Sequence, residues 1–83
     1  MTDDRIFEIV KEEENNLSKE EIEEIEKFLM AKDEFAVYEF MNKLLDSVGD
    51  IKKCINFFTG IDKDVFSYIS VSTAHIIKKR MEK

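Results

Sequence analysis

Apolar side chains recur along this chain at the three- and four-residue spacing of an α-helical face. The first such stretch predicts an amphipathic helix over about residues 2–15, with Glu8, Lys11 and Glu12 on its outer face. The apolar face of this helix consists of Ile6, Phe7, Ile9 and Val10.

A second helix has the clearest start in the sequence. Ser18 is the expected N-cap, and Glu21, three residues later, completes a capping box. Leu17 and Ile22 flank this start at the spacing of a hydrophobic staple. We expect the helix to bury four side chains, Ile22, Ile25, Phe28 and Leu29.

The next stretch predicts the central helix of the fold. Asp33 can cap it, although the pattern also allows the second helix to continue through this position without a break. Between Val37 and Val48 the apolar side chains cover a wide arc of the helical wheel. Such a helix is surrounded by several neighbours, so we expect it at the centre of the molecule.

Proline is absent, and glycine occurs only at positions 49 and 60. Gly49 is followed by Asp50, and Gly60 is followed by Ile61 and then Asp62. This is the order of a glycine past one helix and an N-cap before the next. This order predicts a fourth helix over about residues 51–58 and a fifth that starts near Lys63.

Residues 65–73 are rich in β-branched and aromatic side chains, so a short strand is the alternative to a helix there. We favour a helix because a single strand would have no partner in this chain. The predicted fold is therefore one all-α domain over residues 1–83, a compact bundle of four to five short helices.

The net charge of −6 is distributed unevenly, with −8 in residues 1–34 and +2 in residues 35–83. An acidic N-terminal part disfavours nucleic acid and anionic lipid, and it favours a basic protein partner. We expect no membrane segment, because no apolar run is long enough and the start, MTDDRIFE, is acidic. The single cysteine, Cys54, excludes an internal disulfide and indicates a cytoplasmic protein.

The acidic stretch of the second helix has two interpretations. Its outer face is a solvated surface, or it is the charged rim of a site that docks on a basic protein. The rim residues are Glu20, Glu23, Glu24 and Lys27. Phe35 and Tyr38 are the candidate apolar anchors of the same partner-binding site.

Catalytic, cofactor and metal sites are not expected. His75 is the only histidine, and serines precede it, but nucleophilic catalysis also needs an orienting group, an oxyanion hole and a cleft. We expect instead a partly buried, hydrogen-bonded His75. Cys54 and His75 together supply half of a structural zinc site at most, and Cys54 is expected to be a small buried hydrophobe.

Two other functions are open. The stretch from Ile51 to Ile69 resembles a helix-turn-helix, with Ile55, Ile61, Phe66 and Ile69 at its buried positions, and this resemblance implies nucleic-acid binding through residues 51–80. The acidic net charge and the single cation near the start of the second of these helices, Lys63, disfavour that function. A surplus of aromatic side chains indicates a homodimer as the other alternative.

The function predicted from the sequence is therefore binding to another protein rather than catalysis. We expect a small acidic regulator or inhibitor that occupies a surface on a larger, basic partner. Small acidic inhibitors carried by phages or mobile elements are the analogy that suits this size and charge.

Overall fold

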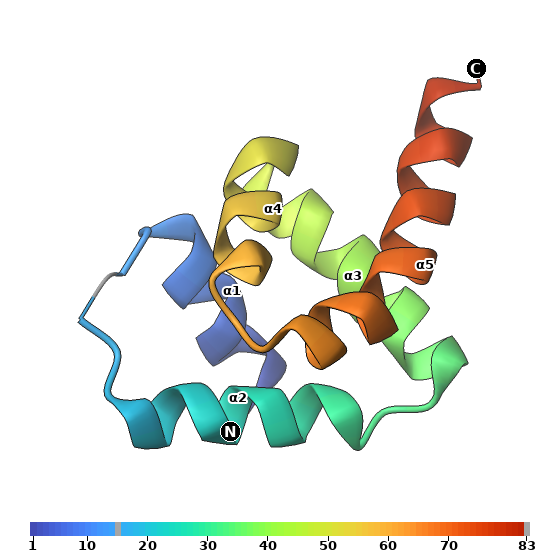
Figure 1. Cartoon of the computed structure of the whole chain (residues 1–83). Helices are drawn as coiled ribbons and strands as arrows, with labels where there is room; N and C mark the ends of the chain where they lie inside the picture. The colour runs from blue at the N-terminus through green and yellow to red at the C-terminus, as the bar shows by residue number, and fades with distance from the viewer. Residues whose placement is uncertain (15, 83) are drawn as a thin grey trace.

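The structure is a computed structural model that describes residues 1–14 and 16–82. These residues form five α-helices and no strand (Figure 1). The helices are α1 (Asp3–Lys11), α2 (Lys19–Met30), α3 (Glu34–Val48), α4 (Ile51–Thr59) and α5 (Lys63–Met81). The predicted all-α bundle is confirmed, and residues 65–73 are helical within α5.

Each helix begins at a polar residue whose side chain accepts a hydrogen bond from the first turn, as the sequence predicts for four of the five. The oxygen of Ser18 accepts from the backbone N–H of Glu21 at 3.1 Å, and Asp33 accepts from Ala36 at 2.8 Å. Asp33 therefore separates α2 from α3, and the alternative of one unbroken helix is wrong.

The first helix is shorter than the predicted range of residues 2–15, and the last position of that range, residue 15, lies outside the described residues. Glu13 has a left-handed backbone with φ of 52°. The N–H of Glu13 donates to the carbonyl of Val10, and the N–H of Glu14 donates to that of Ile9. These two bonds form a Schellman motif, which ends α1 without the glycine that usually marks it.

The two glycines, which the sequence places in the same role, differ in conformation. Gly49 follows α3 with φ of 73°, the left-handed cap that favours glycine. Gly60 follows α4 with φ of −88°, a backbone that any residue adopts. Only Gly49 therefore has a backbone conformation that favours glycine over other residues.

The core is built around α3, which contacts α1, α4 and α5. The ring of Phe40 lies 5.4 Å from that of Phe7 and 6.5 Å from that of Phe28, measured between centroids. Of the four α2 residues predicted to be buried, Ile25 and Leu29 are, whereas Ile22 and Phe28 are half-buried. The largest set of buried side chains comes from α3: Val37, Phe40, Met41, Leu44 and Leu45.

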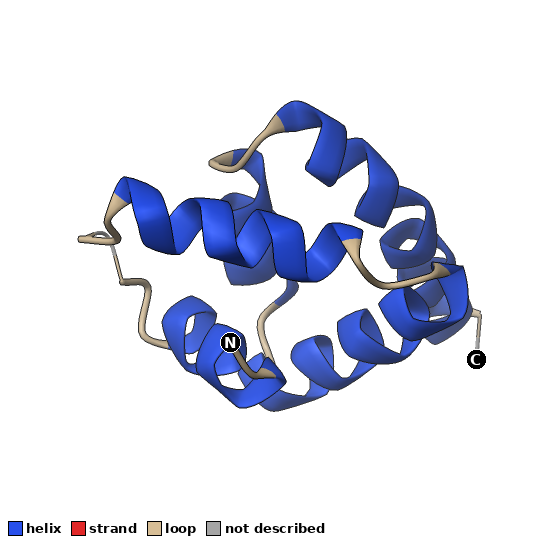
Figure 2. Cartoon of the chain, turned by 90° about the horizontal axis from the view of Figure 1, so that it is seen from below, coloured by secondary structure: helices blue, strands red, loops and turns tan. Residues whose placement is uncertain are grey.

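Short connections join the helices around this core (Figure 2). The last turns of α5 extend beyond the other helices (Figure 1). Arg80 ties this part of α5 to α3, since its Nη2 donates to the side chains of Asn42 and Asp46, each at 2.8 Å. None of the described helices has both the length and the apolar character that crossing a bilayer requires.

Candidate functional site

The glutamates of α2 divide into two groups. Glu21 contacts the guanidinium of Arg5 at 3.4 Å, and Glu26 accepts a hydrogen bond from the backbone N–H of Asp62 at 2.8 Å. These two carboxylates connect α2 to other parts of the fold. The predicted rim residues are exposed on the helix: Glu20, Glu23, Glu24 and Lys27. Glu24 also lies 3.7 Å from the N-terminal amine.

The two predicted anchors, Phe35 and Tyr38, lie in an open groove between α3 and α5. Phe35 is 72% exposed, and Val71 on the α5 side is 63% exposed. The groove has a volume of about 570 Å³. Its lining residues are Glu34, Phe35, Tyr38, Ser67, Tyr68, Val71, Ser72 and His75. Exposed apolar groups of this size, gathered in one hollow, are typical of association surfaces.

The backbone around this groove is held in place by polar contacts. Tyr68 donates a hydrogen bond from its hydroxyl to the backbone carbonyl of Lys32, which connects α5 to the corner between α2 and α3. The ammonium of Lys32 lies 4.4 Å from the centre of the Phe28 ring and 3.5 Å from a carboxylate oxygen of Asp3. The N-cap at Asp33 then places Phe35 in the first turn of α3. The aromatic groove is therefore preformed.

A second hollow of about 390 Å³ continues from this groove toward the end of α5. The two hollows share Tyr38 and His75, and the second is also lined by Lys78, Lys79 and Glu82. The combined surface, which we call the α3–α5 strip, has the carboxylate of Glu34 at one end. Two lysines and one glutamate lie at the other end.

The structure brings together some of the predicted site residues and separates others. Phe35 and Tyr38 share one groove, but the rim residues of α2 do not line it. Val71, on the α5 side of the groove, was missed by the sequence reasoning. Val71 carried a usable signal, because it lies between Ser67 and His75 at four-residue spacing on a polar helical face.

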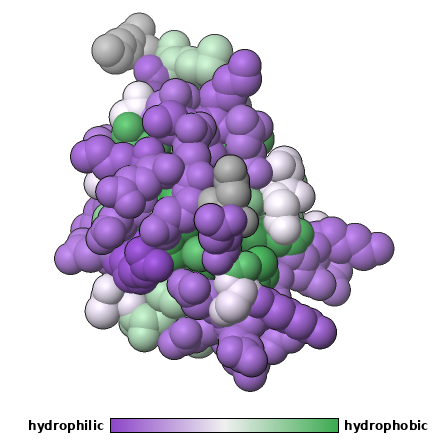
Figure 3. Space-filling model, turned by 90° about the vertical axis from the view of Figure 1, so that its left-hand side faces the viewer, coloured by the Kyte–Doolittle hydropathy of each residue, from purple (hydrophilic) through white to green (hydrophobic). Residues whose placement is uncertain are grey.

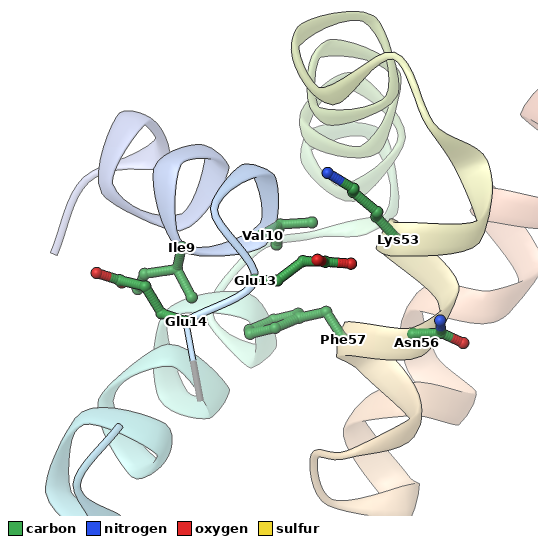
Figure 4. A pocket seen from close by; sticks show the side chains of 7 residues that line it. All are labelled: Ile9, Val10, Glu13, Glu14, Lys53, Asn56 and Phe57. Atoms are coloured by element: carbon green, nitrogen blue, oxygen red, sulfur yellow. The ribbon is translucent and has the colours of Figure 1, made fainter. Parts of the chain in front are cut away.

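A different, polar hollow of about 320 Å³ lies between the end of α1 and α4 (Figure 4). Glu13 extends into it, whereas Glu14 points away, where its Oε2 lies 3.2 Å from the guanidinium of Arg5 (Figure 4). Lys53 donates from its ammonium to the carbonyl of Lys11 at 3.4 Å. These contacts hold the end of α1. The side of the molecule with the α1–α2 connection is largely hydrophilic, with an apolar patch near its centre (Figure 3).

A third, apolar groove of about 200 Å³ separates α4 from α5. The hydroxyls of Ser70 and Thr73 in its wall donate to carbonyls of their own helix, each at 2.9 Å. Ile55 also lines the groove and is 40% exposed, so its predicted burial in a helix-turn-helix is wrong. The predicted burial of Cys54 is confirmed, since this side chain is 1% exposed. Burial raises the pKa of the Cys54 thiol to about 11, and the nearby carboxylate of Asp50 adds to this rise.

His75 is exposed on α5 and not partly buried as expected, because its helical position faces the open groove rather than the core. Two of the hydroxyls near it, those of Ser70 and Thr73, are bound to the α5 backbone and are not oriented toward a histidine. Among residues 1–14 and 16–82, no three His, Cys, Asp or Glu side chains gather as metal ligands.

Comparison of the chain with protein-family models, with curated proteins and with solved structures found no match. The assignment of a function therefore depends on the geometry and chemistry of these surfaces.

Proposed function

We propose that this protein is a non-enzymatic protein-binding module and that the aromatic groove between α3 and α5 is its binding surface. The observation that carries the proposal is the exposure of Phe35, at 72%, beside Val71, at 63%. A ring of this size left in water costs free energy that a partner recovers when it covers the ring.

The chemistry of the groove supports a protein as the ligand. Phenylalanine and tyrosine are enriched in protein interfaces, and a few aromatic side chains there supply most of the binding free energy. Phe35, Tyr38 and Tyr68 meet in one hollow. Because the hydrogen bond from Tyr68 to Lys32 already orders this surface, binding loses little conformational entropy.

A photo-crosslinking experiment tests this proposal. Benzoylphenylalanine in place of Phe35 is expected to form a protein adduct upon illumination in lysate of the native host. The same probe in place of Glu12, which is exposed near the end of α1, is the control and should form none. If the chain with the probe at residue 35 forms no protein adduct, the groove is not a protein-binding surface.

The acidic face of α2 supports a second candidate function, docking on a basic protein surface. Its specific support is that Glu21 and Glu26 are engaged within the fold, whereas Glu20 and Glu23 are exposed. Solvent-exposed carboxylates steer basic partners toward a surface, and this attraction is strongest at low salt. A regulator or inhibitor of a basic protein would use such a face.

Charge reversal separates this second function from a merely solvated helix face. Glu20→Lys with Glu24→Lys should remove a basic partner recovered by affinity capture, while circular dichroism remains unchanged. The control reverses the same number of charges with Glu12→Lys and Glu13→Lys. Equal capture by both variants would exclude the α2 face as the site.

A further inference from the structure

The charges of the α3–α5 strip are arranged so that the surface is complementary to itself. Glu34 lies at the end where Tyr68 meets the α2–α3 corner. Lys78, Lys79 and Glu82 lie at the other end, which leaves an excess of one positive charge there. The exposed side chain of Phe35 lies beside the acidic end, and that of Val71 lies between the two ends. From Ser67 to Lys79 the strip follows α5 for about 18 Å, at 1.5 Å for each residue.

A two-fold axis through the middle of such a strip reverses its direction in the second copy. The same patch then contributes both sides of the interface, as in the usual symmetric dimer. Glu34 of each chain would face the lysine end of the other, so that two equal sets of opposite charges form. An unrelated partner would need the same charges in the reverse order, with positive charge opposite Glu34 and negative charge opposite the two lysines.

We propose that the partner covering the aromatic groove is a second copy of this chain, in a two-fold dimer that pairs Glu34 with Lys78 and Lys79. This inference rests on the proposed function, because it names the partner of the same groove. In the dimer, Phe35 and Val71 become buried at the interface. The acidic face of α2 lies outside the strip in each chain, so the dimer carries two such faces.

The size of the chain is consistent with this assembly. A stable interface buries about 800 Å² on each partner. The chain exposes 5629 Å² in total, so the dimer would cover roughly one seventh of it. The strip, with the first turns of α3 and the outer face of α5, combines the exposed side chains of Phe35 and Val71 with opposite charges at its two ends.

Charge-reversed variants, measured alone and mixed, test the pairing. Sedimentation of the purified wild-type chain should show a dimer. Glu34→Lys should raise the dimer dissociation constant about tenfold or more, and so should Lys78→Glu with Lys79→Glu, because each variant faces like charges at both ends. An equal mixture of the two variants should restore the dimer, since the reversed charge at position 34 of one chain then meets the reversed charges of the other. Mixing cannot repair a misfolded chain, so restoration also excludes loss of folding as the cause.

Matched controls and contrary outcomes complete the experiment. Glu23→Lys, and Lys19→Glu with Lys52→Glu, carry the same charge changes outside the strip and should dimerise as the wild type does. Phe35→Ser should prevent dimerisation alone and in every mixture. A wild-type chain that stays monomeric at millimolar concentration, or a mixture as weak as its components, would overturn the proposal. If the benzoylphenylalanine probe then still captures a different protein, the protein-binding function stands and only the second copy is excluded.

Discussion

At the scale of single residues, two described positions have a left-handed backbone, and only one of them is a glycine. Gly49 adopts φ of 73° and Glu13 adopts φ of 52°. A side chain in this region costs about 1–2 kcal/mol, because its Cβ is too close to the following carbonyl oxygen. The fold therefore accepts this cost at the end of α1 and avoids it at the end of α3.

Exchanging side chains at these helix ends should change stability in opposite directions. Glu13→Gly should raise the free energy of unfolding by about 0.5–1 kcal/mol, since relief of strain exceeds the added flexibility of the unfolded chain. Gly49→Ala should lower it by about 1–2 kcal/mol, although its new Cβ meets no atom within 4 Å. Urea denaturation measures both changes.

Gly60→Ala is the control for these exchanges. Its backbone is right-handed, and an added Cβ lies at an ordinary 3.4 Å from the carbonyl oxygen of Phe57. We expect a change within about 0.5 kcal/mol of zero. A loss as large as that of Gly49→Ala would show that backbone handedness does not control these two positions.

The buried thiol of Cys54 should make stability depend on pH in the alkaline range. The folded pKa is about 11 and the reference value is 9.0, so the unfolded chain loses this proton first. The contribution of Cys54 to the free energy of unfolding is therefore constant below about pH 9 and falls as the pH rises toward 11. Denaturant titrations of the wild type and of Cys54→Ala should diverge in this way. Parallel curves for the two proteins would contradict it.

At the scale of elements, α3 has two different roles along its length. Its middle forms the core, where Met41 and Leu44 have no exposed surface. Its first turn holds Phe35 in solvent, where the ring adds nothing to the core. The same helix therefore supplies both the stability of the fold and the proposed binding surface.

Truncation of these two parts of α3 should separate stability from binding. Leu44→Ala should lower the free energy of unfolding by about 3 kcal/mol, through the lost burial and the cavity left behind. Phe35→Ala should change it by less than about 0.5 kcal/mol. Chemical denaturation measures both changes, at a chain concentration low enough that the wild type and both variants are monomeric. A large loss for Phe35→Ala would mean that the ring is part of the core.

At the scale of the whole molecule, the acidic face of α2 and the exposed ring of Phe35 lie on different surfaces. The N-terminal part, with its net charge of −8 in residues 1–34, carries the acidic face of α2. Phe35, the exposed aromatic side chain among the described residues, lies in the α3–α5 strip. The two surfaces can therefore act independently, so a dimer leaves the acidic faces accessible to a basic protein.

Dimerisation should make the thermal midpoint depend on concentration. Because two chains must meet for the folded dimer to form, mass action raises the midpoint by about 4 °C for a tenfold increase in chain concentration. Calorimetry over a range of concentrations measures this change. Phe35→Ser should remove the dependence, while Glu23→Lys should retain it. A midpoint that is constant in the wild type would argue against the dimer.

Local signals predicted most of the fold. The N-caps at Ser18, Asp33, Asp50 and Asp62 act within one turn of the chain, so their effect is contained in a few consecutive residues. The end of α1 was predicted too late, because Glu13 adopts a conformation that its residue type disfavours. Besides its own two backbone hydrogen bonds, contacts with the rest of the fold, such as Lys53 at the carbonyl of Lys11, support that turn.

By itself, the amino-acid sequence determined that this chain forms helices, where most of them begin, which faces are apolar, and that acidic charge gathers near its start. These properties depend on neighbours within a few residues. Only the tertiary structure decided which apolar side chains stay in solvent, since exposure depends on what other helices cover. Phe35 and Val71 are more than thirty positions apart, and they share a groove because α3 and α5 pack together around the core.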